Sequence, residues 1–178
     1  MNILKQLLSW ILRVPNGSDP SVPYVDPDPK RAAVFAASNL AEEKMAKLEG
    51  PITERLSAVT PLERLAFIAL ELDSQVSNGG FHQFFTNSRG EYDQWLEEIA
   101  ELIPDERFTS VIQSAVAEYE KYDYEGQWEN IGKSWEYFTD GHKDGRFRKL
   151  DQEYYSIKPD LLSVIGLLLL DDGESLES

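Results

Sequence analysis

Apolar residues recur every three to four positions along most of this chain, which is the spacing of one face of an α-helix. Residues 30–49 are rich in strong helix formers. Further helices are expected over residues 91–103, 128–138, 147–155 and 159–170, and another opens at Pro104 with apolar residues at helical spacing from Phe108 to Tyr119. No stretch shows the sustained two-residue alternation of a half-buried strand. The pattern predicts an all-α fold, a single-domain helical bundle of about seven to nine helices.

The clearest boundaries belong to an apolar helix in the middle of the chain. Thr60, Pro61 and Glu63 form a capping box with proline at the first helical position. The residues that follow, to about position 76, are apolar on most sides, which is typical of a buried helix. Asn78-Gly79-Gly80 should end it, and residues 81–86 are expected to form a short aromatic helix.

The two ends of the chain differ from its centre. Residues 1–13 place Ile3, Leu4, Leu7, Leu8 and Ile11 on one stripe, so we expect an N-terminal amphipathic helix. It would pack on the body or on a second copy, with a membrane-surface anchor as the alternative. Five prolines in residues 14–29 predict an extended linker. The predicted organisation is the helix 1–13, the linker 14–29, an acidic domain 30–172 and a tail 173–178.

Charge is distributed very unevenly. Residues 91–178 carry 22 acidic against 8 basic residues, which accounts for −14 of the total net charge of −15. The densest part is residues 91–125, where 11 acidic residues face only Arg107 and Lys121. A hydrophobic fraction of 42% argues against disorder. Such an asymmetry points to a partner of opposite charge.

On a helical wheel of residues 91–105, the apolar side chains fill one arc and the carboxylates the other. Asp93, Glu97 and Glu101 follow one another at four-residue spacing, each step roughly 6 Å along the axis. Acidic residues also gather at the end of the next helix, where the helix dipole disfavours them. The predicted partner-binding acidic surface comprises Glu91, Asp93, Glu97, Glu98, Glu101, Asp105, Glu118, Glu120, Asp123 and Glu125.

The net negative charge disfavours two classes of partner, nucleic acids and anionic lipids. Binding of DNA relies on lysine and arginine, so nucleic acid is not expected as a direct ligand. Anionic lipid is disfavoured for the same reason. No apolar stretch is long enough to span a bilayer, and the chain has no cysteine. We therefore expect a cytoplasmic protein that binds a basic protein, with a homodimer left open.

Signals for catalysis are weak. The chain has two histidines and none of the common nucleotide, hydrolase or zinc motifs. His82 lies among phenylalanines and is expected to be packed. We predict no catalytic residues, no metal site and no cofactor. A small enzyme using His82 with a carboxylate such as Asp73 is kept as an alternative, which a pocket at His82 would favour and burial of His82 would dismiss.

Two motifs resemble a known family. Residues 78–85, Asn78-Gly79-Gly80-Phe81-His82-Gln83-Phe84-Phe85, resemble the N-G-G-F-x-Q-[FY]-F motif of a bacterial family of small domains. Leu150-Asp151-Gln152-Glu153-Tyr154-Tyr155 resembles its second motif, L-D-x-x-Y-Y. The resemblance covers roughly residues 60–170. We expect structural roles for these residues, with Gln83 bonding a buried backbone group: Asn78, Gly79, Gly80, Phe81, Gln83, Phe84, Phe85, Leu150, Asp151, Tyr154 and Tyr155.

The resemblance implies a function, because one class of members is described as a DNA mimic whose surface carboxylates imitate phosphates. By that resemblance the chain would be a non-enzymatic regulator of transcription that occupies the DNA-binding surface of a transcription factor or nucleoid protein. An immunity or antitoxin-like inhibitor of a basic nuclease is the nearest alternative. A structural domain without a dedicated partner is a third.

Overall fold

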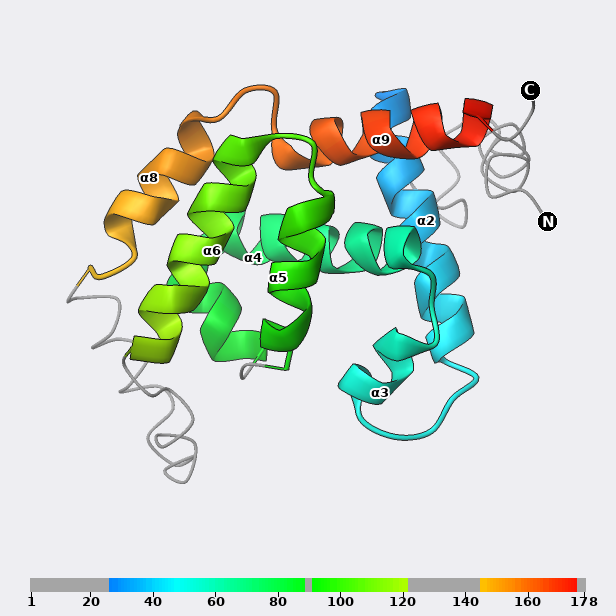
Figure 1. Ribbon diagram of the computed structural model, residues 1–178, viewed down its shortest axis with the longest axis horizontal. Coiled ribbons are helices and arrows are strands. Elements are labelled where there is room, and N and C mark those ends of the chain that lie inside the picture. The colour runs from blue at the N-terminus through cyan, green and yellow to red at the C-terminus, as the bar shows by residue number, and fades with distance from the viewer. Residues whose placement is uncertain (1–25, 89–90, 122–144, 176–178) are drawn as a thin grey trace, which may run out of the picture. The chain divides into compact units, whose positions relative to one another are not determined.

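The computed structural model describes residues 26–88, 91–121 and 145–175, and every regular element in them is a helix. The seven helices are α2 (Pro29–Met45), α3 (Ile52–Ser57), α4 (Pro61–Ser88), α5 (Asp93–Leu102), α6 (Glu106–Lys121), α8 (Arg148–Ser156) and α9 (Leu161–Ser175) (Figure 1). The all-α prediction is confirmed.

Several boundaries differ from those expected. α2 begins one residue early, because Asp28 caps it and Pro29 takes the first turn, and it ends at Met45 rather than near residue 49. The short helix α3 was not anticipated. α9 continues through residues 171–175, three of which were assigned to the tail. The predicted N-terminal helix, residues 14–25 of the predicted linker and the helix expected over residues 128–138 lie outside the described residues.

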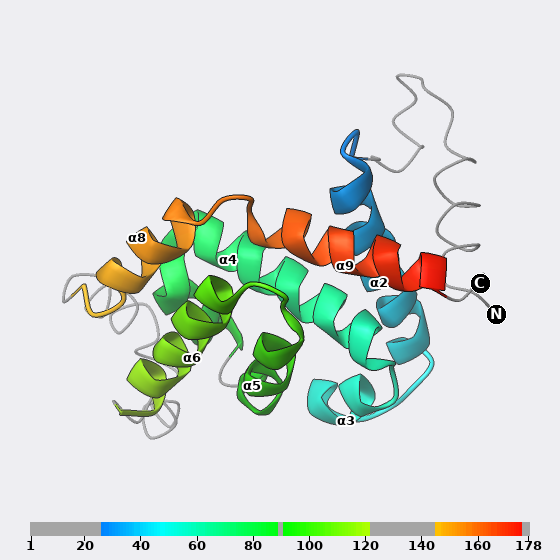
Figure 2. The same cartoon turned by 45° about the horizontal axis from the view of Figure 1, so that its top comes forward.

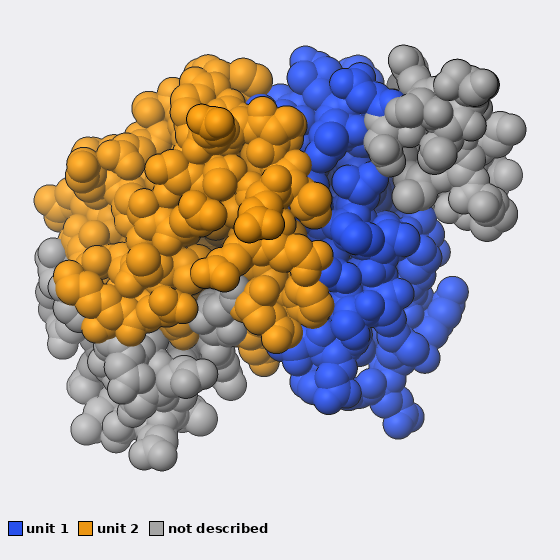
Figure 3. All heavy atoms as spheres, viewed as in Figure 1, with its two compact units in different colours: residues 1–70, 162–178 blue, residues 71–161 orange. Residues whose placement is uncertain are grey.

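The chain divides into two compact units, coloured separately in Figure 3. The first comprises residues 1–70 and 162–178, and its described part holds α2, α3, the beginning of α4 and nearly all of α9. The second comprises residues 71–161 and holds the rest of α4 with α5, α6 and α8. Each unit has buried apolar side chains of its own.

In the first unit, α2 and α9 approach very closely (Figure 2). A Cβ atom on Gly166 would lie 2.2 Å from the carbonyl oxygen of Lys30, so only glycine fits there. The predicted capping box is present: the Glu63 carboxylate accepts from the Thr60 amide at 3.0 Å, and the Thr60 hydroxyl accepts from the Glu63 amide at 3.3 Å. Glu63 also pairs with Lys44.

Aromatic side chains make up much of the core of the second unit. Phe85 stacks on Tyr119 of α6, with ring centroids 4.4 Å apart, and on Phe147 beside α8 at 5.6 Å. Phe81 meets Tyr154 edge to face at 5.7 Å. These rings hold the second part of α4 against α6 and α8. α5 packs on α6, where the Thr109 hydroxyl donates to the Ala100 carbonyl at 2.7 Å.

Candidate protein-interaction surface

Helix α5 has one buried face and one charged face, as its sequence predicts. Leu96, Ile99 and Ala100 are buried against the rest of the second unit. Glu97 and Glu101 are exposed on the other face, with Glu91 exposed just before the helix. We call these three side chains the α5 acidic strip.

The α5 acidic strip carries an unopposed charge along its own stretch of chain. Residues 91–106 contain no lysine or arginine. Glu97 and Glu101 lie one helical turn apart, roughly 6 Å along the axis. Glu98 is half-buried and takes part in interactions with its surroundings. Asp93 begins the helix, and its side chain lies outside the described part of the molecule. The strip is therefore a one-sided concentration of negative charge.

The carboxylate of Asp105, unlike those of the α5 acidic strip, is bonded to a neighbouring arginine. Its carboxylate accepts from the backbone amide of Arg107 at 3.0 Å and from the Arg107 guanidinium at 2.9 and 2.6 Å. These bonds to Arg107 lower the pKa of Asp105 below its ordinary value near 3.8. Asp105 thus caps the start of α6, where acidic residues are favoured, and also balances a basic side chain, a pairing that was not predicted.

Helix α6 interrupts the predicted acidic surface. Residues 108–117 carry no charge, and Ser110, Gln113, Ser114 and Ala117 make up the exposed face there. The remaining carboxylates stand at the far end of the helix: Glu120 is exposed, and Glu118 is half-buried with its carboxylate 3.8 Å from Lys121. Asp123 and Glu125 lie outside the described residues. Of the predicted acids on α6, the described ones thus lie near the end of the helix.

The first motif residues bend α4. Gly79 and Gly80 leave helical geometry, and Gly80 has a φ of 76°, so the helix breaks where the sequence predicted a stop and resumes at Phe81. The Phe81 amide, left without a helical acceptor by the break, donates to the Asp151 carboxylate at 2.8 Å. A Cβ atom on Gly80 would lie 2.6 Å from that carboxylate. Asp151 therefore acts as a helix cap supplied from 70 residues away.

Both tyrosines of the second motif bond to α4 before the break. The Tyr154 hydroxyl donates to Asp73 at 2.9 Å, and the Tyr155 hydroxyl donates to the Val76 carbonyl. Burial, followed by the charge of Asp73, raises the pKa of Tyr154 well above its ordinary value of 10.0. Burial and the charges of Asp151 and Asp73 raise the pKa of Tyr155. α8 thus holds both sides of the bend in α4.

Gln83 bonds to two side chains near the break in α4. Its amide donates to Gln75 at 2.8 Å and accepts from Asn78 at 3.1 Å, and Asn87 also donates to Gln75 at 2.7 Å. These contacts join side chains on both sides of the break near the surface. The expected bond from Gln83 to a buried backbone group stays a prediction. The motif phenylalanines Phe81, Phe84 and Phe85 are buried as predicted, and Leu150 is half-buried.

His82 lies in the core. Its side chain is 3% exposed, and its ring centroid is 6.5 Å from that of Phe147. Asp73, its proposed catalytic partner, accepts a hydrogen bond from the Tyr154 hydroxyl at 2.9 Å. A substrate cannot reach a histidine enclosed in this way, so the enzyme alternative loses its main support.

The described residues offer neither a metal-binding cluster nor a membrane-spanning helix. Within the described residues, no group of three or more histidine and carboxylate side chains is arranged to hold a metal ion. None of the described helices combines the length and apolar character that crossing a membrane requires.

Comparison with known families decides the classification. The model of the DMP19-like protein family matches residues 57–171, from the end of α3 to the last turns of α9. The chain belongs to the DMP19-like family. The match includes the bend in α4, the α5 acidic strip and the tyrosine-bearing helix α8. No curated protein and no solved structure matches the chain.

Proposed function

We propose that this DMP19-like protein is a non-enzymatic DNA mimic that occupies the DNA-binding surface of a basic protein, such as a transcription factor or nucleoid protein. The observation that carries the proposal is the α5 acidic strip, defined by Glu91, Glu97 and Glu101, in a stretch without basic residues. Membership of the DMP19-like family supports it.

Spacing of charge also favours this reading. Successive phosphates of one DNA strand lie about 3.4 Å apart along the axis, and because the strand winds around that axis their separation through space is roughly twice as large. Glu97 and Glu101 are separated by roughly 6 Å of helical rise. Lysine and arginine side chains that contact successive phosphates could contact these carboxylates with little adjustment. DNA and the chain would then compete for one site.

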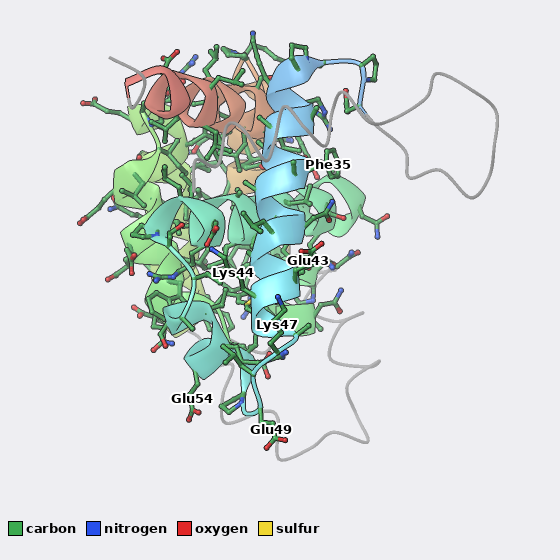
Figure 4. The ribbon with its side chains drawn as sticks, turned by 90° about the vertical axis from the view of Figure 1, so that its right-hand side faces the viewer. Phe35, Glu43, Lys44, Lys47, Glu49 and Glu54 are labelled. Atoms are coloured by element: carbon green, nitrogen blue, oxygen red, sulfur yellow. The ribbon has the colours of Figure 1, made fainter. Side chains whose placement is uncertain are left out.

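The other unit offers an internal contrast. Figure 4 shows Glu43, Lys44, Lys47 and Glu49 near the end of α2 and on the loop that follows it, so both signs of charge are interspersed there. A mixed surface of this kind is typical of solvated protein. It supplies matched positions for a control.

The test is a double charge reversal, Glu97→Lys with Glu101→Lys. The full-length protein is immobilised and proteins captured from a bacterial lysate are identified. We expect captured DNA-binding proteins to be released by added duplex DNA, because both ligands need the same basic groove. The reversal should weaken their capture by about tenfold or more, roughly 1.4 kcal/mol.

The control is Glu43→Lys with Glu49→Lys, which changes net charge equally on the first unit. It should leave capture unchanged, and circular dichroism should report unchanged helix content for both variants. Capture that survives the α5 reversal, or that duplex DNA fails to displace, would contradict the proposal. Capture of a basic nuclease instead would favour the inhibitor alternative.

A further inference from the structure

A groove of about 460 Å³ lies in the second unit between the start of α6 and the end of α8. Its volume falls within the roughly 300–1,000 Å³ typical of ligand-binding pockets. Val111 and Ile157, both buried, contribute apolar surface to its lining. Ser110 and Ser156 add hydroxyl groups. The groove thus combines an apolar surface with polar edges.

The charged side chains that line the groove are two carboxylates and one guanidinium. Glu106 and Glu153 line it, and both are exposed. Arg107 also lines it, but its guanidinium is engaged by the Asp105 carboxylate and donates to the Lys158 carbonyl at 3.1 Å. Lys149 lies 3.6 Å from Glu153, and both of these side chains are largely exposed, so this pair is weak.

Backbone electrostatics acts in the same direction at one end of the groove. Ser156 is the last residue of α8, and the last turn of this helix contains no basic side chain. The carbonyl groups at a helix C-terminus carry partial negative charge and favour a cation. At the other end, the dipole of α6 is already capped by Asp105. A positively charged occupant is therefore favoured over a neutral or negative one.

We propose that this groove receives a lysine or arginine side chain of the basic partner. The apolar lining would cover the aliphatic stem, and Glu106 and Glu153 would bind the charged end, as long basic side chains commonly do on protein surfaces. The inference rests on the proposed function for the identity of the partner. It adds an anchoring site outside the α5 acidic strip.

The test is an NMR titration of the full chain with N-acetyl-arginine amide as the probe. N-acetyl-citrulline amide, which has nearly the same shape without the charge, is the matched ligand. We expect the arginine probe to shift the backbone amide signals of Val111 and Ile157, with binding of the citrulline probe about three- to fivefold weaker.

Two variants locate the effect. Ser110→Phe places a bulky side chain in the groove and should abolish the shifts at Ile157. Ser114→Phe lies one turn further along α6 on exposed surface outside the groove, and should leave those shifts intact. Absence of shifts, equal shifts with both probes, or shifts that persist in Ser110→Phe would overturn the inference.

The outcome is separable from the test of the proposed function. If Ser110→Phe leaves partner capture intact while the α5 reversal abolishes it, the groove inference is wrong and the proposed function stands. If the α5 reversal has no effect on capture, the proposed function is wrong whatever the titration gives.

Discussion

Asp105 illustrates how a single residue can look functional in sequence and prove local in structure. The predicted acidic surface includes it as one of the 11 acidic residues in the dense segment 91–125. In the structure its two carboxylate oxygens are bonded to Arg107, two residues on. The Asp-x-Arg spacing at a helix start was the available signal. A carboxylate already paired in this way has less charge to offer a partner.

The pairing makes a testable prediction about pH. Arg107→Gln should raise the pKa of Asp105 toward its ordinary value near 3.8, because the guanidinium that stabilises the ionised carboxylate is gone. An NMR titration of the Asp105 carboxyl group would measure the change. Since the folded-state pKa is lowered, the interaction stabilises the fold fully above about pH 3.8 and is lost as pH falls through the folded-state value.

An Asp105 carboxyl group that titrates identically in the wild type and in Arg107→Gln would show that the ion pair does not form in solution.

At the scale of elements, the sequence predicted those features that depend on local rules. The capping box at Thr60 and Glu63, the amphipathic α5 and the break at Gly79 and Gly80 all follow from nearby residues, and all are present. The tertiary partners of the break could not be predicted. Asp151, which caps the helix after Gly80, lies 70 residues from Phe81, and helical periodicity carries no information about such pairs.

The same limit applies to the acidic surface. The wheel of α5 correctly separates Glu97 and Glu101 from the buried Leu96 and Ile99. How the surface continues onto a second helix depends on tertiary packing, which periodicity does not report. The sequence of residues 108–117 contains no charged residue, so the uncharged exposed face of α6 could have been predicted. The prediction relied on the total number of acidic residues in the segment and passed over this gap. Composition thus predicted that the surface is negatively charged, but it could not predict which helices carry that charge.

The bend in α4 leads to a prediction about stability. Gly80→Ala should destabilise the fold for two reasons: the positive φ is unfavourable for alanine, and the new Cβ would displace the Asp151 carboxylate from the Phe81 amide. The first effect costs about 1–3 kcal/mol, because a φ of 76° with a ψ of 179° is a conformation that only glycine adopts readily, and the second costs about 1–3 kcal/mol. Thermal unfolding followed by circular dichroism would measure both together.

Gly145→Ala is the matched control for this bend. Gly145 also has a positive φ, of 66°, but its added Cβ would meet only the flexible side chain of Arg148 at 3.3 Å. Its substitution should therefore cost the conformational part alone, about 1–2 kcal/mol. Equal losses of stability in the two variants would contradict the proposed role of Asp151.

At the scale of the whole molecule, the family motifs stabilise the fold, whereas the surface charge is proposed to bind the partner. The motif residues around Gly80, Asp151 and Tyr154 hold α4 and α8 together and are mostly buried or half-buried. The α5 acidic strip lies outside both motifs. A member of the DMP19-like family can thus keep its fold while its surface charges, and with them its partner, change.

The proposed function therefore concerns this chain's surface and follows only in part from its family. Residues 91–178 hold nearly all of the net negative charge, whereas residues 1–90 are close to neutral. Charge concentrated in one part of a chain directs encounter with a basic partner and makes the association rate fall steeply as salt is added.

The central claim is that the α5 acidic strip occupies a partner's DNA-binding surface. Hydrogen exchange of the complex with the captured partner tests it most directly, because each chain reports its own contact. We predict slower exchange in α5 of this chain and in the DNA-contacting element of the partner, at the same positions that duplex DNA protects. Protection confined to α2 and α3, or to a partner surface that DNA leaves unprotected, would contradict the account.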